Sequence, residues 1–254
     1  MEQEKAIKVY STEYLNKGYF TIPNFISSNE VEDIKKAVDE TSNRKDVDIY
    51  HDRSGTLRRM EYFIFKNNLF KNLNEEFKKL LFNVTSKKQK LFKDKVNFKP
   101  PSGEGFFAHY DGVFQFTTSD GLIKNGWYEY AKNFNNVLIA LDDFTSLNGP
   151  LEVANACKGD FDTLLKHTKL NGTPEIKDEL VRSMVFKPMI VSKGSLIVFK
   201  HNCPHRSSSN RSSSERGSMY FTYTNAEDGD FYEKYFSDKH KSINIHKSLI
   251  GEKT

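Results

Sequence analysis

The spacing of hydrophobic residues in the first third of the chain predicts mainly helices. Val31, Ile34 and Val38 recur at intervals that place them on one face of a helix. Ser27, with Glu30 three residues later, predicts a capping box at the start of that helix. A second amphipathic helix is predicted to carry its apolar side chains at Leu73, Phe77, Leu80 and Leu81.

Shorter elements flank these two helices. A helix over residues 11–16 is predicted to end before Gly18, because glycine disfavours the continuation of a helix. Strands are predicted over residues 19–23 and 60–65, where aromatic and β-branched residues gather. The first third of the chain is therefore expected to be mainly helical.

From about residue 91 the pattern changes to short apolar runs separated by turn signals. Turns are indicated at residues 100–103, 148–150 and 193–195, which are rich in Pro, Gly, Asn and Ser. The strands predicted between them cover residues 96–99, 136–142, 151–153, 189–191, 195–199 and 218–224. Many short strands after a helical preface predict a mainly β protein with flanking helices, built on a double-stranded β-helix (a cupin-like jelly roll).

The chain is expected to fold as one domain. Its 254 residues are enough for one sizeable core, and no Pro-, Gly- or Ser-rich linker divides them. We expect a single domain over residues 1–254, in which a helical N-terminal third (about 1–90) packs on the jelly-roll core (about 91–240). The Ser-rich run 207–214 lies between two predicted strands, and we expect it to be a connecting loop.

Charge and composition argue against several classes of protein. The chain carries 38 Lys and Arg against 34 Asp and Glu, with the two signs interleaved, so no general nucleic-acid-binding surface is indicated. No apolar run is long enough to cross a membrane, and the polar N-terminus is unlike a secretory signal. We therefore expect no nucleic-acid or membrane partner and a cytoplasmic location, with Cys157 and Cys203 reduced. Cys203 is expected to be a buried small side chain near the site; a metal-ligand role is the alternative.

The strongest candidate for chemistry is the His-x-Asp tripeptide at residues 109–111. Alternate residues of a strand face the same side, so His109 and Asp111 can point at one ion. His205, which follows the predicted strand 195–199, would complete two imidazoles and one carboxylate. This is the facial triad that binds non-haem Fe(II) and leaves positions open for a co-substrate and oxygen. Taken alone, the tripeptide is also compatible with an accident of the surface.

Arg216 is a second candidate, eleven residues after His205 and at the head of another predicted strand. The Ser-rich loop between them resets the strand alternation, so Arg216 can face the same cavity as His205. A guanidinium there would bind a carboxylate through two parallel hydrogen bonds. The alternative is a surface arginine paired with Glu215 or Glu227.

Several blocks of the chain share their order and spacing with a known family. They are residues 97–103, 109–111, 148–153, 194–199, 204–207 with 210, and 216 with 220–223. In this order they resemble the phytanoyl-CoA dioxygenase superfamily of Fe(II)- and 2-oxoglutarate-dependent oxygenases. The resemblance covers about residues 14–239, nearly the whole chain.

The resemblance implies a dioxygenase that uses Fe(II), the co-substrate 2-oxoglutarate, and O2. The implied iron ligands are His109, Asp111 and His205. Arg216 would hold the distal carboxylate of 2-oxoglutarate, with the Ser207 hydroxyl assisting. Arg59 matches a basic position that also contacts the co-substrate; a solvated charge at a strand edge is the alternative. Tyr110 stands where relatives commonly have Gln, and we expect it to face outward. Because halogenating relatives lack the carboxylate, Asp111 implies hydroxylation.

Within the superfamily, the chain most resembles the 2-aminoethylphosphonate hydroxylases. The matching blocks are residues 58–63, 92–99, 222–226, 229–230 and 238–239. They imply hydroxylation of a small organophosphonate at the carbon next to phosphorus. The candidates for holding such an anionic substrate are Lys95, Asn97 and Arg58, and Trp127 with Tyr128 would face a substrate ammonium. For each of them the alternative is a salt bridge or packing contact that only stabilises the fold.

Two other functions stay open from the sequence. One is hydroxylation of a different small metabolite, such as an amino acid or a compatible solute. The other is a non-catalytic jelly-roll binding protein, because the same fold serves both purposes. The sequence is also compatible with a homo-oligomer.

Overall fold

Two antiparallel sheets form the centre of the molecule, for which a computed structural model describes residues 2–52, 55–118 and 120–249. In the larger sheet, the described strands lie in the order β1-β11-β8-β13-β4-β3-β2. Their bounds are β1 Tyr19–Ile22, β11 Leu196–Lys200, β8 Phe134–Ala140, β13 Arg216–Asn225, β4 Gln89–Lys99, β3 Leu57–Glu61 and β2 Asp48–His51. The smaller sheet has the order β10-β9-β12-β5, with β10 Lys187–Pro188, β9 Leu151–Val153, β12 His205–Ser207 and β5 Phe106–His109. This arrangement is a cupin-like jelly roll, as the sequence predicted.

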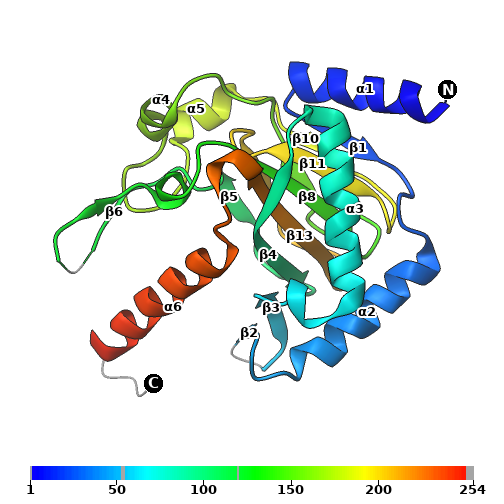
Figure 1. Cartoon of the computed structure of the whole chain (residues 1–254), viewed down its shortest axis with the longest axis horizontal. Coiled ribbons are helices and arrows are strands. Elements are labelled where there is room, and N and C mark those ends of the chain that lie inside the picture. The colour runs from blue at the N-terminus through cyan, green and yellow to red at the C-terminus, as the bar shows by residue number, and fades with distance from the viewer. Residues whose placement is uncertain (1, 53–54, 119, 250–254) are drawn as a thin grey trace.

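Helices cover the outer face of the larger sheet (Figure 1). They are α1 Glu2–Asn16, α2 Ser28–Ser42 and α3 Asn68–Thr85. Phe77 of α3 packs edge-on against Phe221 of β13, with ring centroids 5.0 Å apart. Burying each side chain of this size contributes roughly 1.5–3 kcal/mol, so the contact between helices and sheet is a main source of stability.

The alternation of strand residues divides the larger sheet into an apolar and a polar face. On β13, Met219 and Phe221 belong to the core beneath the helices. Tyr220 and Thr222, which alternate with them, face the opposite side, where they line a cavity together with alternate residues of β4. Polar side chains on one face of a buried strand therefore build the site, while the apolar face holds the sheet against the helices.

Further elements connect and flank the two sheets. A hairpin of β6 Phe116–Thr117 and β7 Ile123–Lys124 extends from one side, followed by the 3-10 helix η2 Gly126–Glu129 (Figure 1). The short helices α4 Phe161–His167 and α5 Asp178–Ser183 lie between β9 and β10 in the chain. The 3-10 turns η1 Ile64–Lys66 and η3 Ala226–Asp228 precede α3 and α6, respectively, and α6 spans Tyr232–Leu249. None of the helices in the described residues is long and apolar enough to cross a membrane.

Several predicted elements are confirmed. The capping box of α2 is present, because Ser27 Oγ accepts from the Glu30 N–H and the Glu30 carboxylate accepts from the Ser27 N–H. The apolar stripes predicted for α2 and α3 are buried. Strand β9 has the predicted bounds.

Other boundaries differ from the prediction. The strand expected over residues 60–65 already ends at Glu61, because Tyr62 takes a left-handed backbone conformation with φ 60°. The buried Asp94 carboxylate then accepts the backbone N–H groups of residues 62–64, which holds them in a turn. The strand expected over 189–191 is replaced by β10 and a single bridge between Val191 and Phe144. Helix α1 begins at Glu2, well before residue 11.

The first ninety residues contribute strands as well as helices. Strand β1 pairs with β11 at one edge of the larger sheet, and β3 pairs with β4 near the other edge, with β2 outside it. Strand β2 was not predicted, since its short sequence carries little apolar alternation. The N-terminal third therefore extends the sheet in addition to covering it.

Candidate active site

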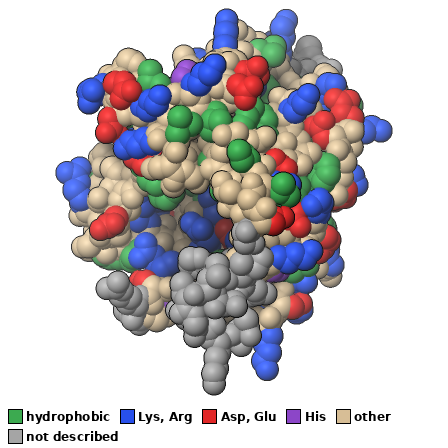
Figure 2. Space-filling model, turned by 90° about the vertical axis from the view of Figure 1, so that its left-hand side faces the viewer, with side chains coloured by type: hydrophobic (Ala, Val, Ile, Leu, Met, Phe, Trp, Pro, Cys, Tyr) green, Lys and Arg blue, Asp and Glu red, His purple; other side chains and the backbone are tan. Residues whose placement is uncertain are grey.

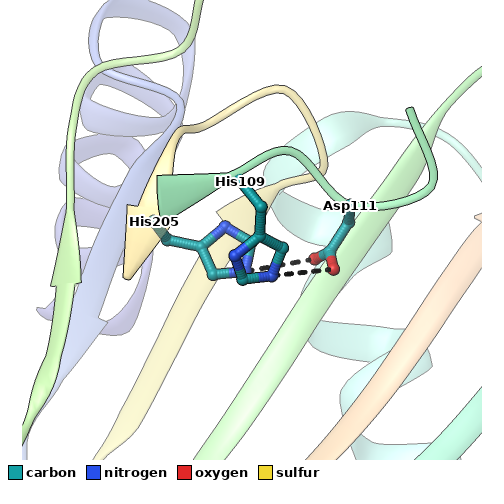
Figure 3. Close-up of side chains that lie close together, drawn as sticks. All are labelled: His109, Asp111 and His205. Carbon is teal, nitrogen blue, oxygen red and sulfur yellow. Dashed lines mark ion pairs between the residues drawn. The ribbon is translucent and has the colours of Figure 1, made fainter. Parts of the chain in front are cut away.

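The two histidines of the predicted triad are neighbours across a strand pair. Strand β5 ends at His109 and strand β12 begins at His205, and these two residues are directly opposite in the register. Their ring centroids lie 4.0 Å apart. Asp111 follows β5, with its carboxylate 4.0 Å from Nε2 of His109 and 3.7 Å from Nε2 of His205 (Figure 3). The ligand atoms of all three lie within 4.8 Å of one another, which is close enough to share one metal ion.

Backbone contacts orient both imidazole rings. His109 Nδ1 lies 3.0 Å from the carbonyl oxygen of Phe107, and His205 Nδ1 lies 3.0 Å from that of Cys203. A carbonyl can only accept a hydrogen bond, so we assign the proton to Nδ1 in both rings. Each Nε2 therefore keeps its lone pair facing Asp111, as metal ligation requires.

Side-chain hydrogen bonds hold the carboxylate of Asp111 in place. Asn136 Nδ2 donates to Asp111 Oδ2 at 2.8 Å, and Thr222 Oγ1 donates to Asn136 Oδ1 at 2.8 Å. Both supporting residues are buried, on β8 and β13. The sequence analysis missed Asn136 and Thr222, although polar residues inside two strongly apolar strands were a signal that these positions face a polar site.

Burial and charge favour the protonation states that bind a cation. Burial, together with the neighbouring His205, lowers the pKa of His109 to about 3, so its imidazole is neutral at pH 7. Burial alone would raise the pKa of Asp111, but the attraction of His205 and His109 outweighs it and the pKa is lowered. A neutral His109 imidazole and an ionised Asp111 carboxylate are the forms of these groups that ligate a divalent metal.

The triad opens into a cavity of about 590 Å³. Its wall is formed by strands of both sheets, the loop after β5 and residues 172–174. Figure 2 shows a hollow on one face of the molecule with Lys and Arg side chains gathered in it. A cavity of this size accommodates a small ligand beside the metal.

Arg216 lies at one end of this cavity, as predicted. It begins β13 opposite Lys99 of β4, it is only 5% exposed, and its guanidinium lies 4.6 Å from the ring centroid of Phe144. In the part of the chain that the structure describes, its buried Nε and Nη1 have no hydrogen-bond partner. A buried cation with unpaired donors is costly unless a ligand completes it, and the carboxylate of 2-oxoglutarate fits this requirement.

Ser207 and Lys99 flank this arginine. Lys99 Nζ donates to Ser207 Oγ at 2.8 Å and to the Ser208 carbonyl at 2.6 Å. Burial and the nearby Arg216 lower the pKa of Lys99 to about 8. The sequence analysis did not select Lys99, although cations at 93, 95 and 99 share one face of β4 and could have indicated it.

The other predicted polar residues line the cavity from β3 and β4. Arg59 is opposite Asn97 in the register, and its Nε donates to Asn97 Oδ1 at 3.0 Å. Arg58 donates to the Phe98 carbonyl at 3.1 Å and lies 3.5 Å from the Asp52 carboxylate. Lys95 lies 4.3 Å from the ring centroid of Tyr220, and burial lowers its pKa to about 7.

The structure corrects the prediction for Tyr128. This residue does not line the cavity; its hydroxyl contacts His201 Nε2 at 2.8 Å, and its ring packs on Phe161. Trp127, its neighbour in η2, lines the cavity instead, but the ammonium of Lys93 already lies 5.1 Å from its ring. Tyr128 therefore cannot face a substrate ammonium in this geometry.

Two further expectations concern residues beside the triad. Tyr110 points away from the cavity, but it is fully buried and its hydroxyl contacts Cys157 Sγ and His167 Nδ1, both at 3.1 Å, so it does not face solvent. Cys203 is fully buried, as predicted, and is not part of the metal-ligand cluster. Both cysteines are free thiols.

The model of the family "Phytanoyl-CoA dioxygenase (PhyH)" matches residues 14–218, about four fifths of the sequence. The chain belongs to this family. It is 26% identical over 247 residues to a methylphosphonate hydroxylase of Gimesia maris, which covers 93% of this chain and 87% of that protein. It is 27% identical over 154 residues to a 2-aminoethylphosphonate dioxygenase of the uncultured bacterium HF130_AEPn_1, covering 60% of this chain and 52% of that protein.

Solved structures of low sequence identity share the fold. The apo crystal structure of EctD from S. alaskensis superposes with a TM-score of 0.67 at 15% identity, covering 86% of this chain and 76% of that one. The carbocyclase SnoK from nogalamycin biosynthesis superposes with a TM-score of 0.63 at 15% identity, covering 86% of this chain and 84% of the SnoK chain. The likeness covers 86% of this chain in both cases and confirms the jelly-roll architecture.

Family and site together define the class of enzyme. A phytanoyl-CoA dioxygenase family member with a His-Asp-His triad is a dioxygenase that uses Fe(II), 2-oxoglutarate and O2 and acts on a small molecule. The buried guanidinium of Arg216, whose Nε and Nη1 have no partner among the described residues, fits the co-substrate independently of the family relationship.

Proposed function

We propose that this dioxygenase hydroxylates a small organophosphonate, such as 2-aminoethylphosphonate or methylphosphonate, at the carbon next to phosphorus. The names of the two relatives above support this substrate class, although their identity to this chain is low. A third relative, 30% identical over 154 residues, is a probable hypophosphite dioxygenase of Stutzerimonas stutzeri. Three relatives named for phosphorus oxyanions or phosphonates are consistent with one type of anionic substrate.

The charge of the cavity wall is the observation that carries the proposal. Among the described lining residues, the carboxylates are Glu104 and Asp111. The cations are Arg58, Arg59, Lys93, Lys95, Lys99, Arg206 and Arg216. Asp111 is assigned to the metal, so the remaining wall is strongly cationic. One dicarboxylate co-substrate leaves several cations for a second anion.

We assign the two anions to different ends of the cavity. Arg216, with Ser207 and Lys99, would hold the distal carboxylate of 2-oxoglutarate. The phosphonate would contact Lys95, Asn97 and the arginines of β3, which lie on the neighbouring strands. Arg59 contacts Asn97 directly, so we place it with the substrate group, whereas the sequence resemblance placed it with the co-substrate.

The residues of the chain would contribute positioning and exclusion of water. His109, Asp111 and His205 would hold Fe(II), which with 2-oxoglutarate and O2 supplies the oxidising chemistry that converts a C–H bond to C–OH. Anchoring the phosphonate on β3 and β4 would leave the adjacent carbon within reach of the metal. Phe106 and Phe107, stacked at 4.4 Å beside the His109 ring, would keep water from the metal side.

The test is succinate formation coupled to loss of substrate, measured across phosphonates, free amino acids and ectoine-like solutes. We expect tight coupling with a phosphonate. Lys95→Met should raise the KM for that phosphonate and leave the KM for 2-oxoglutarate nearly unchanged. Lys90→Met is the matched control, because Lys90 lies on the same strand but forms a surface ion pair with Asp230.

The alternative substrate class is decided by the same panel. Coupled turnover of an amino acid or a solute, with none of any phosphonate, would remove the phosphonate proposal and leave the dioxygenase assignment intact. Whether the protein is a homo-oligomer stays a prediction.

A further inference from the structure

We propose that Lys239 of helix α6 is a positioning residue for the substrate end of the cavity: it neutralises the buried carboxylate of Glu61, so that Arg59 keeps its charge available to a bound anion. This inference rests on the proposed role of Arg59 in binding the substrate. Helix α6 lies beyond the segment matched by the family model, which ends at residue 218.

Glu61 is the centre of the link. It is the last residue of β3, it is 1% exposed, and its two carboxylate oxygens face different cations. Oε2 pairs with the ammonium of Lys239, and Oε1 lies 3.7 Å from Nη1 of Arg59. Burial would raise the pKa of Glu61, but the attraction of Lys93, Lys239 and Arg59 outweighs it and lowers the pKa to about 2. Glu61 is therefore ionised, and several cations compete for one buried negative charge.

Arg59 connects this carboxylate to the cavity. Its Nε donates to Asn97 Oδ1 at 3.0 Å, and its side chain is 44% exposed where it lines the cavity wall. The distance of 3.7 Å to Glu61 is longer than a direct hydrogen bond between these groups. The guanidinium is thus attracted by Glu61 without being fully engaged by it.

Helix α6 is fixed on the strands that carry these residues. The Tyr232 hydroxyl donates to Asp94 Oδ2 at 2.8 Å, and His240 Nε2 lies 2.8 Å from both carboxylate oxygens of Asp48 on β2. Phe236 is buried against Tyr62, with ring centroids 4.7 Å apart. These contacts on both sides of Lys239 hold its ammonium at Glu61.

Removing the ammonium of Lys239 would change the balance at Glu61. The carboxylate would then draw Arg59 into a closer, paired geometry and away from the cavity, because a buried carboxylate needs a cationic partner. The cavity would lose part of the charge of Arg59, which lines its wall. The expected result is weaker binding of an anion at the substrate end, with no change at Arg216.

The experiment compares Lys239→Met with Lys241→Met, whose exposed side chain lies two residues further along α6. Each variant removes one positive charge from the same helix, so an effect of total charge would be equal in both. Dissociation constants of methylphosphonate and of inorganic phosphate are measured by calorimetry on the full-length protein, loaded with Fe(II) and 2-oxoglutarate without oxygen. The affinity for 2-oxoglutarate and the Tm are measured separately.

We expect Lys239→Met to weaken both anions by roughly 2- to 30-fold, as is usual for coupling through intervening residues. The affinity for 2-oxoglutarate should stay the same, and Lys241→Met should behave as wild type. Lys239→Arg should restore anion binding. If Lys239→Met does not fold, Lys239→Gln retains a hydrogen bond to Glu61 without the charge and should show the same loss.

Each contrary outcome has one meaning. Unchanged anion affinity in Lys239→Met and Lys239→Gln overturns the inference, and so does an equal loss of anion and 2-oxoglutarate affinity, which would indicate a general loss of packing. If the wild type binds phosphate but oxidises no phosphonate, the proposed substrate is wrong and the phosphate measurement still decides the role of Lys239. If it binds neither anion, the inference fails because the substrate end does not bind anions.

Discussion

Arg216 and Arg59 line the same cavity, but their guanidinium groups are held in opposite ways. Arg216 is almost completely buried in the middle of the larger sheet, and two of its nitrogen atoms have no partner among the described residues. Arg59 is about half exposed near the edge of that sheet, and it already contacts Asn97 and Glu61. The fold leaves two nitrogen atoms of Arg216 without a hydrogen-bond partner among the described residues, whereas the guanidinium of Arg59 already contacts polar neighbours.

Under the proposed assignment, this difference suits the two ends of the cavity to different ligands. A buried cation with unpaired hydrogen-bond donors destabilises the free protein, and the stability is recovered when a carboxylate binds to it. Such a cation suits the co-substrate, which is the same molecule in every turnover. A cation near a sheet edge that already has polar contacts keeps its position without a ligand. The residues around it can be substituted with little loss of core stability. Under the same proposal, a residue as distant in sequence as Lys239 influences the substrate end through Glu61.

The metal between the two ends gives the largest expected effect. His205→Ala removes one of three ligands, and we expect iron binding to fall to background. Anaerobic addition of Fe(II) and 2-oxoglutarate to the wild type should give a weak visible charge-transfer band that the variant lacks. His51→Ala, at the exposed end of β2, is the control. Full iron content in His205→Ala would show that the triad assignment is wrong.

Arg216→Met tests whether hydrogen-bond donors of this arginine lack partners until a ligand binds. Loss of a desolvated charge pair costs on the order of 2–5 kcal/mol, so 2-oxoglutarate should bind roughly 30-fold or more weakly. In the ligand-free protein the same change removes a buried cation of which Nε and Nη1 have no partner among the described residues, and the Tm should rise by about 2–4 °C per kcal/mol gained. Calorimetric titration and thermal unfolding measure the two effects.

The control for this prediction is Arg211→Met in the exposed part of the loop before β13. It should change neither the affinity nor the Tm. Unaltered 2-oxoglutarate binding in a folded Arg216→Met protein would contradict the assignment, and a lower Tm would indicate that the fold already completes Arg216.

The sequence already pointed to residues that the structure brings together around one cavity. His109 and Asp111 share one face of a short extended segment, so local alternation indicated their common direction, whereas His205 and Arg216 were selected because each lies next to a strongly apolar strand. The blocks around them also carry the family resemblance. The jelly roll followed from the same short strands and turns.

The substrate end could not be predicted in the same way. The contact of Arg59 with Asn97 depends on which strands become neighbours, and the link from Glu61 to Lys239 joins residues 178 positions apart. The error at Tyr128 has a local cause, because η2 is a single 3-10 turn in which neither helical nor strand alternation shows which residue faces the cavity. Contacts between distant segments and irregular turns are the information that one sequence lacks.

Asn136→Ala tests how the metal carboxylate is held between the two ends. Without its donor, Asp111 keeps its charge but loses the hydrogen bond that orients it, so iron affinity should fall on the order of tenfold. Thr222→Val should give a smaller loss, because Thr222 acts only through Asn136. Competition with a fluorescent chelator measures both. Equal iron affinity in wild type and Asn136→Ala would show that Asp111 needs no such support.

The smallest effect is expected from Glu61→Gln, which tests whether the substrate end is stabilised by its own ion pairs. The folded state lowers the pKa of Glu61 from its ordinary value of 4.5 to about 2. A lowered pKa means that ionised Glu61 stabilises the fold above pH 4.5 and that this contribution is lost as the pH falls toward 2. At pH 7, Glu61→Gln should reduce the free energy of unfolding by on the order of 1–2 kcal/mol, less than the full linkage value because the amide oxygen still accepts from Lys239. Denaturant unfolding of both proteins should show a difference in the free energy of unfolding that is smaller at pH 3 than at pH 7. If the difference in the free energy of unfolding does not depend on pH, Glu61 stabilises the fold through packing. The ion pairs of Glu61 would then not explain how Arg59 is held in place.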